Sequence, residues 1–212
     1  MRSVAIIGIG ETKMGKYPDR SLRQMIQEAG SAAIHDAGIP KENIQAVFMG
    51  NFIGQQLTGQ GHMGPMVSEV LGLGSIPTVR TEGACASGGL AFRQALMAVQ
   101  SGFYDIILVG GAEKMCHRET ETVTEAIASA MDYELEAIQG CTFPANFAMI
   151  ANRYFHEYRN VKREMGLCAV NAHANASLNP DAQMPKPVDL DKVLNAPYIA
   201  DPLGLFDCSL VT

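Results

Sequence analysis

The sequence lacks a long apolar run and any cluster of basic residues. No stretch approaches the roughly 18 consecutive apolar residues that a membrane-spanning helix requires. Lys and Arg total 16 against 22 Asp and Glu, so the formal net charge is −6 and no global field attracts nucleic acid or an anionic membrane. Binding of an anionic molecule would therefore depend on a few local basic groups.

The sequence also lacks closely spaced cysteines, and its opening residues do not resemble a leader. Its five cysteines are odd in number and never form a Cys-x-x-Cys pair, which argues against a disulfide framework and a zinc site. We therefore predict no metal. The first eight residues are too short for a signal peptide and continue into a glycine-containing turn. We therefore expect a cytoplasmic protein, or one delivered by a signal that these residues do not show.

Strands and helices alternate over the first 110 residues or so. The periodicity predicts strands at 4–10, 44–49, 77–81 and 105–109, and helices at 21–37, 65–71 and 86–101. The glycine- and glutamine-rich stretch 51–64 is expected to be a loop. Such alternation is typical of parallel βαβ units, so the predicted fold is α/β with layers and right-handed crossovers.

The pattern changes after residue 112. Residues 119–139, 146–158 and 161–178 are predicted to be helical, 179–203 irregular, and 205–211 a weak strand. The expected organisation is an α/β core over residues 1–112 and a mostly helical insertion over 113–200. Residues 201–212 are expected to return towards the core sheet.

Cys85 differs from the other cysteines in its local pattern. It follows the predicted strand 77–81 after a short turn, and it stands directly before a helix that begins Ala86-Ser87-Gly88-Gly89. At a helix N-terminus the macrodipole and the unpaired N–H groups favour the reactive thiolate. Small neighbours leave room for a thioester, so Cys85 is predicted to be an acyl-accepting nucleophile, the alternative being a buried structural cysteine.

Several segments in the expected order resemble the thiolase superfamily. Residues 82–88, Glu-Gly-Ala-Cys-Ala-Ser-Gly, are similar to the nucleophile motif of the family. Residues 105–115 match the strand after the nucleophile helix, with its Gly-Gly-x-Glu-x-Met run. Residues 4–12, 143–148 and 207–212 resemble further segments. The resemblance covers essentially the whole chain and favours the sterol-carrier-type and acetyl-CoA acetyltransferase branch.

The resemblance implies a thiolase-like layered fold: an N-terminal βαβαβ half with a mostly helical loop-domain insertion. It implies acyl transfer through a thioester on Cys85, with coenzyme A thioesters as substrates and no covalently bound cofactor. His117, Phe143 and Asn146 are the expected substrate-binding residues. The family also suggests a homodimer, and relatives in this branch sometimes work with a small OB-fold, zinc-ribbon partner subunit.

Several thiolase motifs are not found in residues 1–212. The family takes its proton-transfer groups from a second, similar half that carries a Gly-His-Pro motif and a Cys-x-Gly motif. Neither is present here, and the five histidines stand in no comparable motif. We therefore expect that the C-terminal half is absent and that this chain alone is inactive.

Two alternatives remain open from the sequence. The chain could be a related condensing enzyme, such as a ketoacyl or hydroxymethylglutaryl-CoA synthase, although the Gly-Gly-x-Glu-x-Met run and the long insertion favour a thiolase. It could also be a non-catalytic CoA- or acyl-binding or assembly subunit that keeps the thiolase fold. The acyl chain length and the direction of the reaction are not encoded in any motif we identify.

Overall fold

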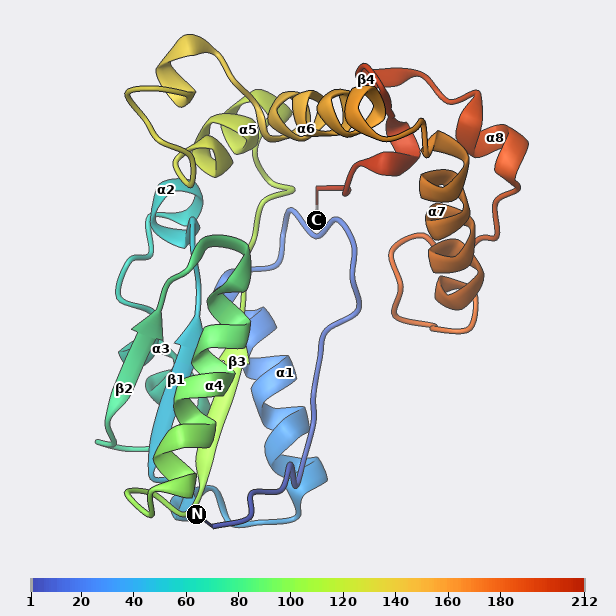
Figure 1. Cartoon of the computed structure of the whole chain (residues 1–212). Coiled ribbons are helices and arrows are strands. Elements are labelled where there is room, and N and C mark those ends of the chain that lie inside the picture. Colours follow the sequence, from blue (N-terminus) through green and yellow to red (C-terminus); the bar gives the residue numbers. More distant parts are fainter. Residues whose placement is uncertain (1, 212) are drawn as a thin grey trace. The chain divides into compact units, whose positions relative to one another are not determined.

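The computed structural model describes residues 2–211 and separates the chain into two compact units (Figure 1). Unit 1 holds the chain up to Thr12 together with Tyr17–Arg118, and unit 2 holds Lys13–Lys16 together with the chain from Glu119 onward. Met1 and Thr212, the outer ends of the predicted domain ranges, lie outside the described residues. Each unit is described separately below.

A three-stranded parallel sheet forms the centre of unit 1. Strand β1 (Ala46–Gly50) lies between β2 (Thr78–Thr81) and β3 (Ile107–Gly111) and is parallel to both. Val47 pairs with Thr78 on one side and with Leu108 on the other. Because all three strands run the same way, their carboxyl ends meet at one edge of the sheet.

Helices cover both faces of this sheet. Helix α4 (Ser87–Gln100) crosses in front of it in Figure 1, while α1 (Leu22–Ala37) and α3 (Met63–Leu71) lie behind. The main apolar core joins the buried residues of α1 and α3 to β1: Leu22, Ile26, Val47, Met49, Met63, Met66, Val67 and Leu71. On α4 the buried apolar residues are alanines, so this helix lies close against the strands.

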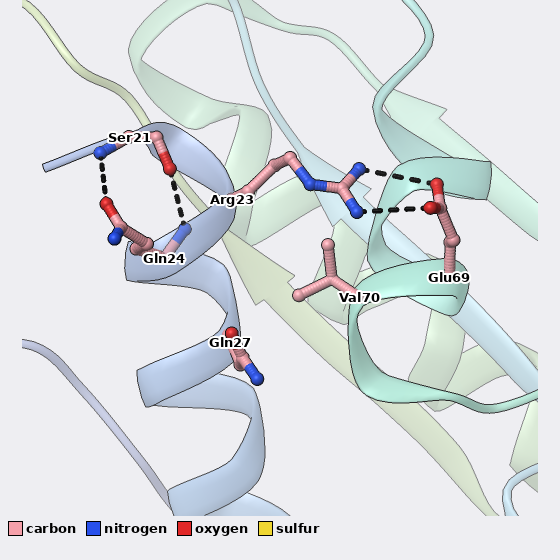
Figure 2. Close-up of a pocket in the computed structure, with 6 residues that line it drawn as sticks. All are labelled: Ser21, Arg23, Gln24, Gln27, Glu69 and Val70. Carbon is pink, nitrogen blue, oxygen red and sulfur yellow. Dashed lines mark hydrogen bonds and ion pairs between the residues drawn. The ribbon is translucent and has the colours of Figure 1, made fainter.

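Helix α1 is closed at both ends by side-chain and backbone caps. Ser21 accepts a hydrogen bond from the Gln24 amide, and the Gln24 side chain accepts one from the Ser21 amide, which makes a capping box (Figure 2). Gly38 ends the helix in the left-handed conformation, with φ of 62°. Figure 2 also shows Arg23 of α1 paired with Glu69 of α3 across a pocket between the two helices.

The predicted buried first strand is wrong. Residues 4–10 are extended but form no strand, and Ile6 and Ile9 are 69% and 74% exposed. Gly8 and Gly10 lie so close to α1 that a Cβ on either would come within 2.5 Å of helix backbone atoms. The segment therefore packs on α1 through its glycines, but within the described residues no strand pairs with it. The sequence encodes its apolar character, whereas strand pairing requires a neighbour.

Three other secondary-structure predictions also differ from the structure. The predicted loop 51–64 contains a short helix, α2 (Gly54–Thr58), whose Leu57 is almost completely buried. The predicted helix 119–139 is reduced to α5 (Thr120–Ala128) and a later 3-10 turn, Ala137–Gln139. The weak strand 205–211 is replaced by a 3-10 turn at Leu205–Asp207. Another 3-10 turn, Lys41–Asn43, precedes β1.

Unit 2 is mostly helical, as the sequence predicts for this region. Its further elements are α6 (Phe143–Glu157), α7 (Lys162–Ala176), α8 (Leu190–Leu194), and an antiparallel pair of β4 (Tyr198–Ala200) and β5 (Leu203–Gly204). Gly166 lets α7 approach α8, since a Cβ there would lie 2.9 Å from Leu190. The largely buried pair of Lys162 and Asp207 ties α7 to the turn after β5.

Replacing Ser21 by Ala removes the acceptor of the capping box. We expect Ser21→Ala to lower the free energy of unfolding by about 1 kcal/mol, because an orphan amide of the first turn loses its partner. Ser31→Ala is the matched control: Ser31 is exposed inside the same helix, where Ala has the higher helix propensity. Urea unfolding followed by circular dichroism measures both. Equal stability of the two variants would contradict the role of the cap.

Candidate active site

Cys85 lies in a single 3-10 turn, η2 (Ala84–Ala86), between the end of β2 and the start of α4. The strand–cysteine–helix order predicted from the sequence is therefore present. The Cys85 side chain is exposed, and Ser87, the first residue of α4, is buried. The turn places the thiol at the carboxyl edge of the parallel sheet, where α/β proteins gather their sites.

The turn is strained and is held by two side chains. Ala84 has a φ of 48°, in the left-handed region that L-residues other than glycine, asparagine and aspartate rarely adopt. The buried Ser87 hydroxyl donates to the Ala84 carbonyl at 2.7 Å and accepts from the Gly83 amide at 3.0 Å. The Glu82 carboxylate accepts from the Ala84 amide at 2.6 Å. These bonds fix the backbone on both sides of Cys85.

Gly50 allows β1 to touch the start of α4. A Cβ on Gly50 would lie 2.6 Å from the Gly88 amide nitrogen and 2.7 Å from the Ser87 carbonyl carbon. Both are backbone atoms, which cannot move aside as a flexible side chain can. The carboxyl end of β1 is thus in direct backbone contact with the first turn of the helix that follows Cys85.

Polar side chains connect the ends of the three strands. Glu113, which follows β3, accepts through Oε1 from the Asn51 side chain at 2.9 Å and from the amides of Phe52 and Ile53. Arg80 of β2 donates to the carbonyls of Asn51 and Phe52 at 3.3 and 2.7 Å. Burial raises the pKa of Glu113 above its ordinary value, while the two amides and the Arg80 charge oppose that rise.

Two buried oxygen atoms in this cluster have no hydrogen-bond partner among the described residues. They are Oε2 of Glu113 and Oδ1 of Asn51, whose residue is 1% exposed. The Asn51 amide nitrogen is occupied by the carbonyl of Ala112 and by Glu113. This cluster was not predicted from the sequence. The signal available was the position of Asn51 and Glu113 within a few residues of the ends of the predicted strands 44–49 and 105–109, where parallel sheets collect functional polar groups.

The other predicted site residues are distributed over both units. His117 lies in unit 1, half-buried, with Nε2 at 3.0 Å from the Leu57 carbonyl oxygen, and its Nδ1 has no partner among the described residues. Phe143 and Asn146 lie on the first turn of α6 in unit 2. Phe143 stacks on Phe147, and the Asn146 amide donates to the Met131 sulfur at 3.0 Å. Their role in substrate binding stays a prediction.

The described part of the chain offers no group of three or more His, Cys, Asp or Glu side chains that could hold a metal ion. Within residues 2–211, none of the helices has the length and apolar character needed to span a membrane. The observable chemistry of unit 1 is therefore an exposed thiol on a strained turn at the start of a long helix.

The fold of unit 1 and the turn at Cys85 are those of an α/β protein that presents a cysteine at the carboxyl edge of a parallel sheet. A family model described as "Thiolase, N-terminal domain" matches residues 4–201. The chain therefore belongs to the thiolase family, and the membership predicted from the sequence is confirmed.

Individual relatives support the same assignment. The chain is 45% identical to an acetyl-CoA acetyltransferase of Methanothermobacter thermautotrophicus, covering 100% of this chain and 55% of the relative. It is 46% identical to another of Methanocaldococcus jannaschii, covering 100% and 54%. Sterol carrier protein 2 of Gallus gallus is 27% identical over 98% of this chain and 39% of its own length.

A solved structure titled "Ltp2-ChsH2(DUF35) aldolase" is similar with a TM-score of 0.72 and 28% identity, covering 97% of this chain and 52% of that one. The acetyl-CoA acetyltransferase of Syntrophomonas wolfei has a TM-score of 0.60 at 18% identity, covering 81% and 45%, which shows the fold alone. The chain thus spans about half the length of the acetyltransferases that it matches.

Replacing Ser87 by Ala removes the two hydrogen bonds that Ser87 contributes to the turn. We expect Ser87→Ala to cost about 1–3 kcal/mol of unfolding free energy, because the Gly83 amide and the Ala84 carbonyl lose their buried partner. Ser101→Ala is the matched control, since the Ser101 hydroxyl also bonds a backbone carbonyl, that of Ala98, but in an exposed position. Thermal unfolding of the two variants measures the difference, and similar melting temperatures would contradict the assigned role.

Proposed function

We propose that this chain is the nucleophile-bearing part of a thiolase-type acyl-CoA acyltransferase, with Cys85 as the acyl acceptor. The observation that carries the proposal is the exposed Cys85 on a strained turn directly before α4, in a chain that matches the thiolase N-terminal domain. Relatives at 45% and 46% identity bear the name acetyl-CoA acetyltransferase. The substrates proposed for this chain are therefore coenzyme A thioesters.

The proposed reaction is a two-step exchange. The Cys85 thiolate attacks the 3-keto carbonyl carbon of a 3-ketoacyl-CoA, forming a C–S bond. The bond between carbons 2 and 3 then breaks, leaving an acyl thioester on Cys85 and the enolate of acetyl-CoA, which takes up a proton. The thiol of a second CoA then attacks the thioester, releases the new acyl-CoA and returns the proton and the thiolate. Claisen condensation is the reverse.

What unit 1 contributes to this reaction is orientation of the nucleophile. The hydroxyl of Ser87 and the carboxylate of Glu82 fix the backbone beside Cys85, so the thiol is presented without a large loss of conformational freedom. The N-terminal end of α4 carries a partial positive charge, which favours a developing oxyanion beside it. The family resemblance assigns the proton transfers to motifs that residues 1–212 do not contain.

We propose further that the enzyme needs a second half to be active. The apolar residues 4–9 are exposed on an extended segment without a paired strand, and β3 is paired only with β1 in the described sheet. Apolar surface of this kind and an open strand edge are features that folded proteins normally cover. A polypeptide corresponding to the remaining half of the relatives would supply such a cover.

The proposed partners follow the family. We propose a homodimer, and a small OB-fold, zinc-ribbon subunit as an additional partner. Two comparisons point to multi-component relatives: a solved structure whose title names both Ltp2 and ChsH2(DUF35), and a benzoylsuccinyl-CoA thiolase subunit of Thauera aromatica that is 29% identical. The proposed location is the cytoplasm, where acyl-CoA exchange would serve lipid metabolism.

Selective alkylation tests the role of Cys85. We expect iodoacetamide to modify Cys85 about tenfold faster or more than Cys168, because Cys85 precedes a helix N-terminus and Cys168 does not. Cys168 is the internal control: it is also exposed but lies in the middle of α7. Peptide mass spectrometry follows each site, and Cys85→Ser should abolish the fast phase while Cys168→Ser leaves it intact. Equally slow thiols would favour the alternative, a non-catalytic assembly or acyl-binding subunit.

Turnover by the isolated chain tests the need for a second half. We expect purified residues 1–212 to show no thiolysis of acetoacetyl-CoA, since the family's proton-transfer motifs are not in this sequence. The full-length acetyltransferase of Methanothermobacter thermautotrophicus, assayed under the same conditions, is the positive control. Loss of the enolate absorbance measures the rate. Sustained turnover by the 212-residue chain that disappears in Cys85→Ser would refute the requirement while keeping the catalytic cysteine.

A further inference from the structure

Glu113 holds the backbone that follows β1 against the end of β3 through hydrogen bonds. Its Oε1 atom accepts three hydrogen bonds, from the side chain of Asn51 and from the amides of Phe52 and Ile53, the last at 3.2 Å. Asn51 is bound a second time by the carbonyl of Ala112, at 2.9 Å. The segment that follows β1 is therefore fixed to β3 by one carboxylate oxygen and one backbone carbonyl.

Arg80 fixes the same segment from the other side. Its guanidinium donates to the carbonyls of Asn51, Phe52 and Gly61, the last at 3.1 Å. The amide of Asn51 also donates to the carbonyl of Thr81, the last residue of β2, at 3.2 Å. One short segment is thus bound by side chains from β2 and from the end of β3, so its position depends on both neighbours.

This segment adjoins the turn that bears Cys85. Asn51 directly follows Gly50, whose backbone contacts Gly88 and Ser87 with no room for a Cβ. Ser87 in turn bonds both residues that precede Cys85. A shift of residues 50–53 would therefore press directly on the first turn of α4, because a close-packed backbone contact transmits displacement.

We propose that Glu113 is a positioning residue for Cys85. Together with Arg80 and Asn51 it fixes the ends of three strands, and through the contact of Gly50 with Gly88 it holds the turn in the conformation that exposes the thiol. Glu113 acts through the backbone, not on the substrate. The inference rests on the proposed function, because it concerns the nucleophile assigned there.

A purely stabilising role explains the composition of this cluster less well. Glu113 is half-buried, burial raises its pKa, and its Oε2 atom has no partner among the described residues. A buried carboxylate and the unpaired Oδ1 of Asn51 each carry a desolvation cost that apolar residues of similar volume avoid. A carboxylate can bind three hydrogen-bond donors at once, and an apolar residue cannot. These three bonds fix the backbone of the segment that follows β1.

The experiment compares four variants of the 212-residue chain with the wild type. Glu113→Ala removes the acceptor, and Glu113→Gln keeps an amide oxygen that can accept the same three hydrogen bonds. Glu69→Ala removes an exposed carboxylate of α3. Ile26→Val, in the core between α1 and the sheet, lowers stability without touching the cluster. The rate of Cys85 alkylation by iodoacetamide is measured across a pH series, well below each melting temperature.

We expect Glu113→Ala to slow Cys85 alkylation at neutral pH by about tenfold and to displace its pH profile, because the turn no longer holds the thiol in its native position before α4. Glu113→Gln should stay within about twofold of the wild type, since the acceptor is retained. Glu69→Ala and Ile26→Val should leave the profile unchanged. A wild-type profile for Glu113→Ala, or the same displacement in Ile26→Val, would overturn the proposal.

A second measurement separates this proposal from the function on which it rests. If wild-type Cys85 reacts no faster than Cys168, the nucleophile assignment fails, and amide hydrogen exchange of residues 83–88 then decides the positioning role. Faster exchange there in Glu113→Ala, but not in Glu69→Ala, supports positioning, and unchanged exchange refutes it. Should Glu113→Ala fail to fold, Arg80→Lys gives the same comparison, because Lys keeps the charge but lacks the guanidinium geometry that reaches three carbonyls.

Discussion

The backbone contact between Gly50 and Gly88 is the constraint on which the candidate site depends. It brings the end of β1 against the first turn of α4, at distances that a single methyl group would violate. Parallel strands place their carboxyl ends at one edge, but this contact decides how closely a helix can start there. Because of this contact, the connection between β2 and α4 is short. It contains Ala84 in the left-handed conformation and the exposed Cys85, and it ends at the buried Ser87.

Much of the fold follows from local sequence signals. The apolar periodicity of α1, with Ser21 at its start and Gly38 at its end, identifies both boundaries to within one residue. β1, β2 and β3 follow from short apolar or β-branched runs near glycine, with boundaries that differ by one or two residues. The strand predicted at residues 4–10 is wrong, because apolar character predicts burial in a sheet but cannot show whether a neighbouring strand exists.

The candidate site was predictable in part. Cys85 could be singled out because its neighbours are small and its position between strand and helix has a known electrostatic consequence. The cluster of Asn51, Arg80 and Glu113 could not be assembled from the sequence, because its members are separated by about 30 residues or more and their contacts depend on strand order. Nor does local pattern show that Arg80 uses its donors on backbone carbonyls instead of on an anionic ligand.

The exposed segment at residues 4–9 has a consequence for how this polypeptide is made. Within the structure described, these residues acquire no strand partner from the rest of the chain. Apolar strand-forming segments that stay uncovered are substrates for chaperones and starting points for aggregation. The yield of soluble protein in a cell will therefore depend on how soon this segment is covered, as much as on the stability of either unit.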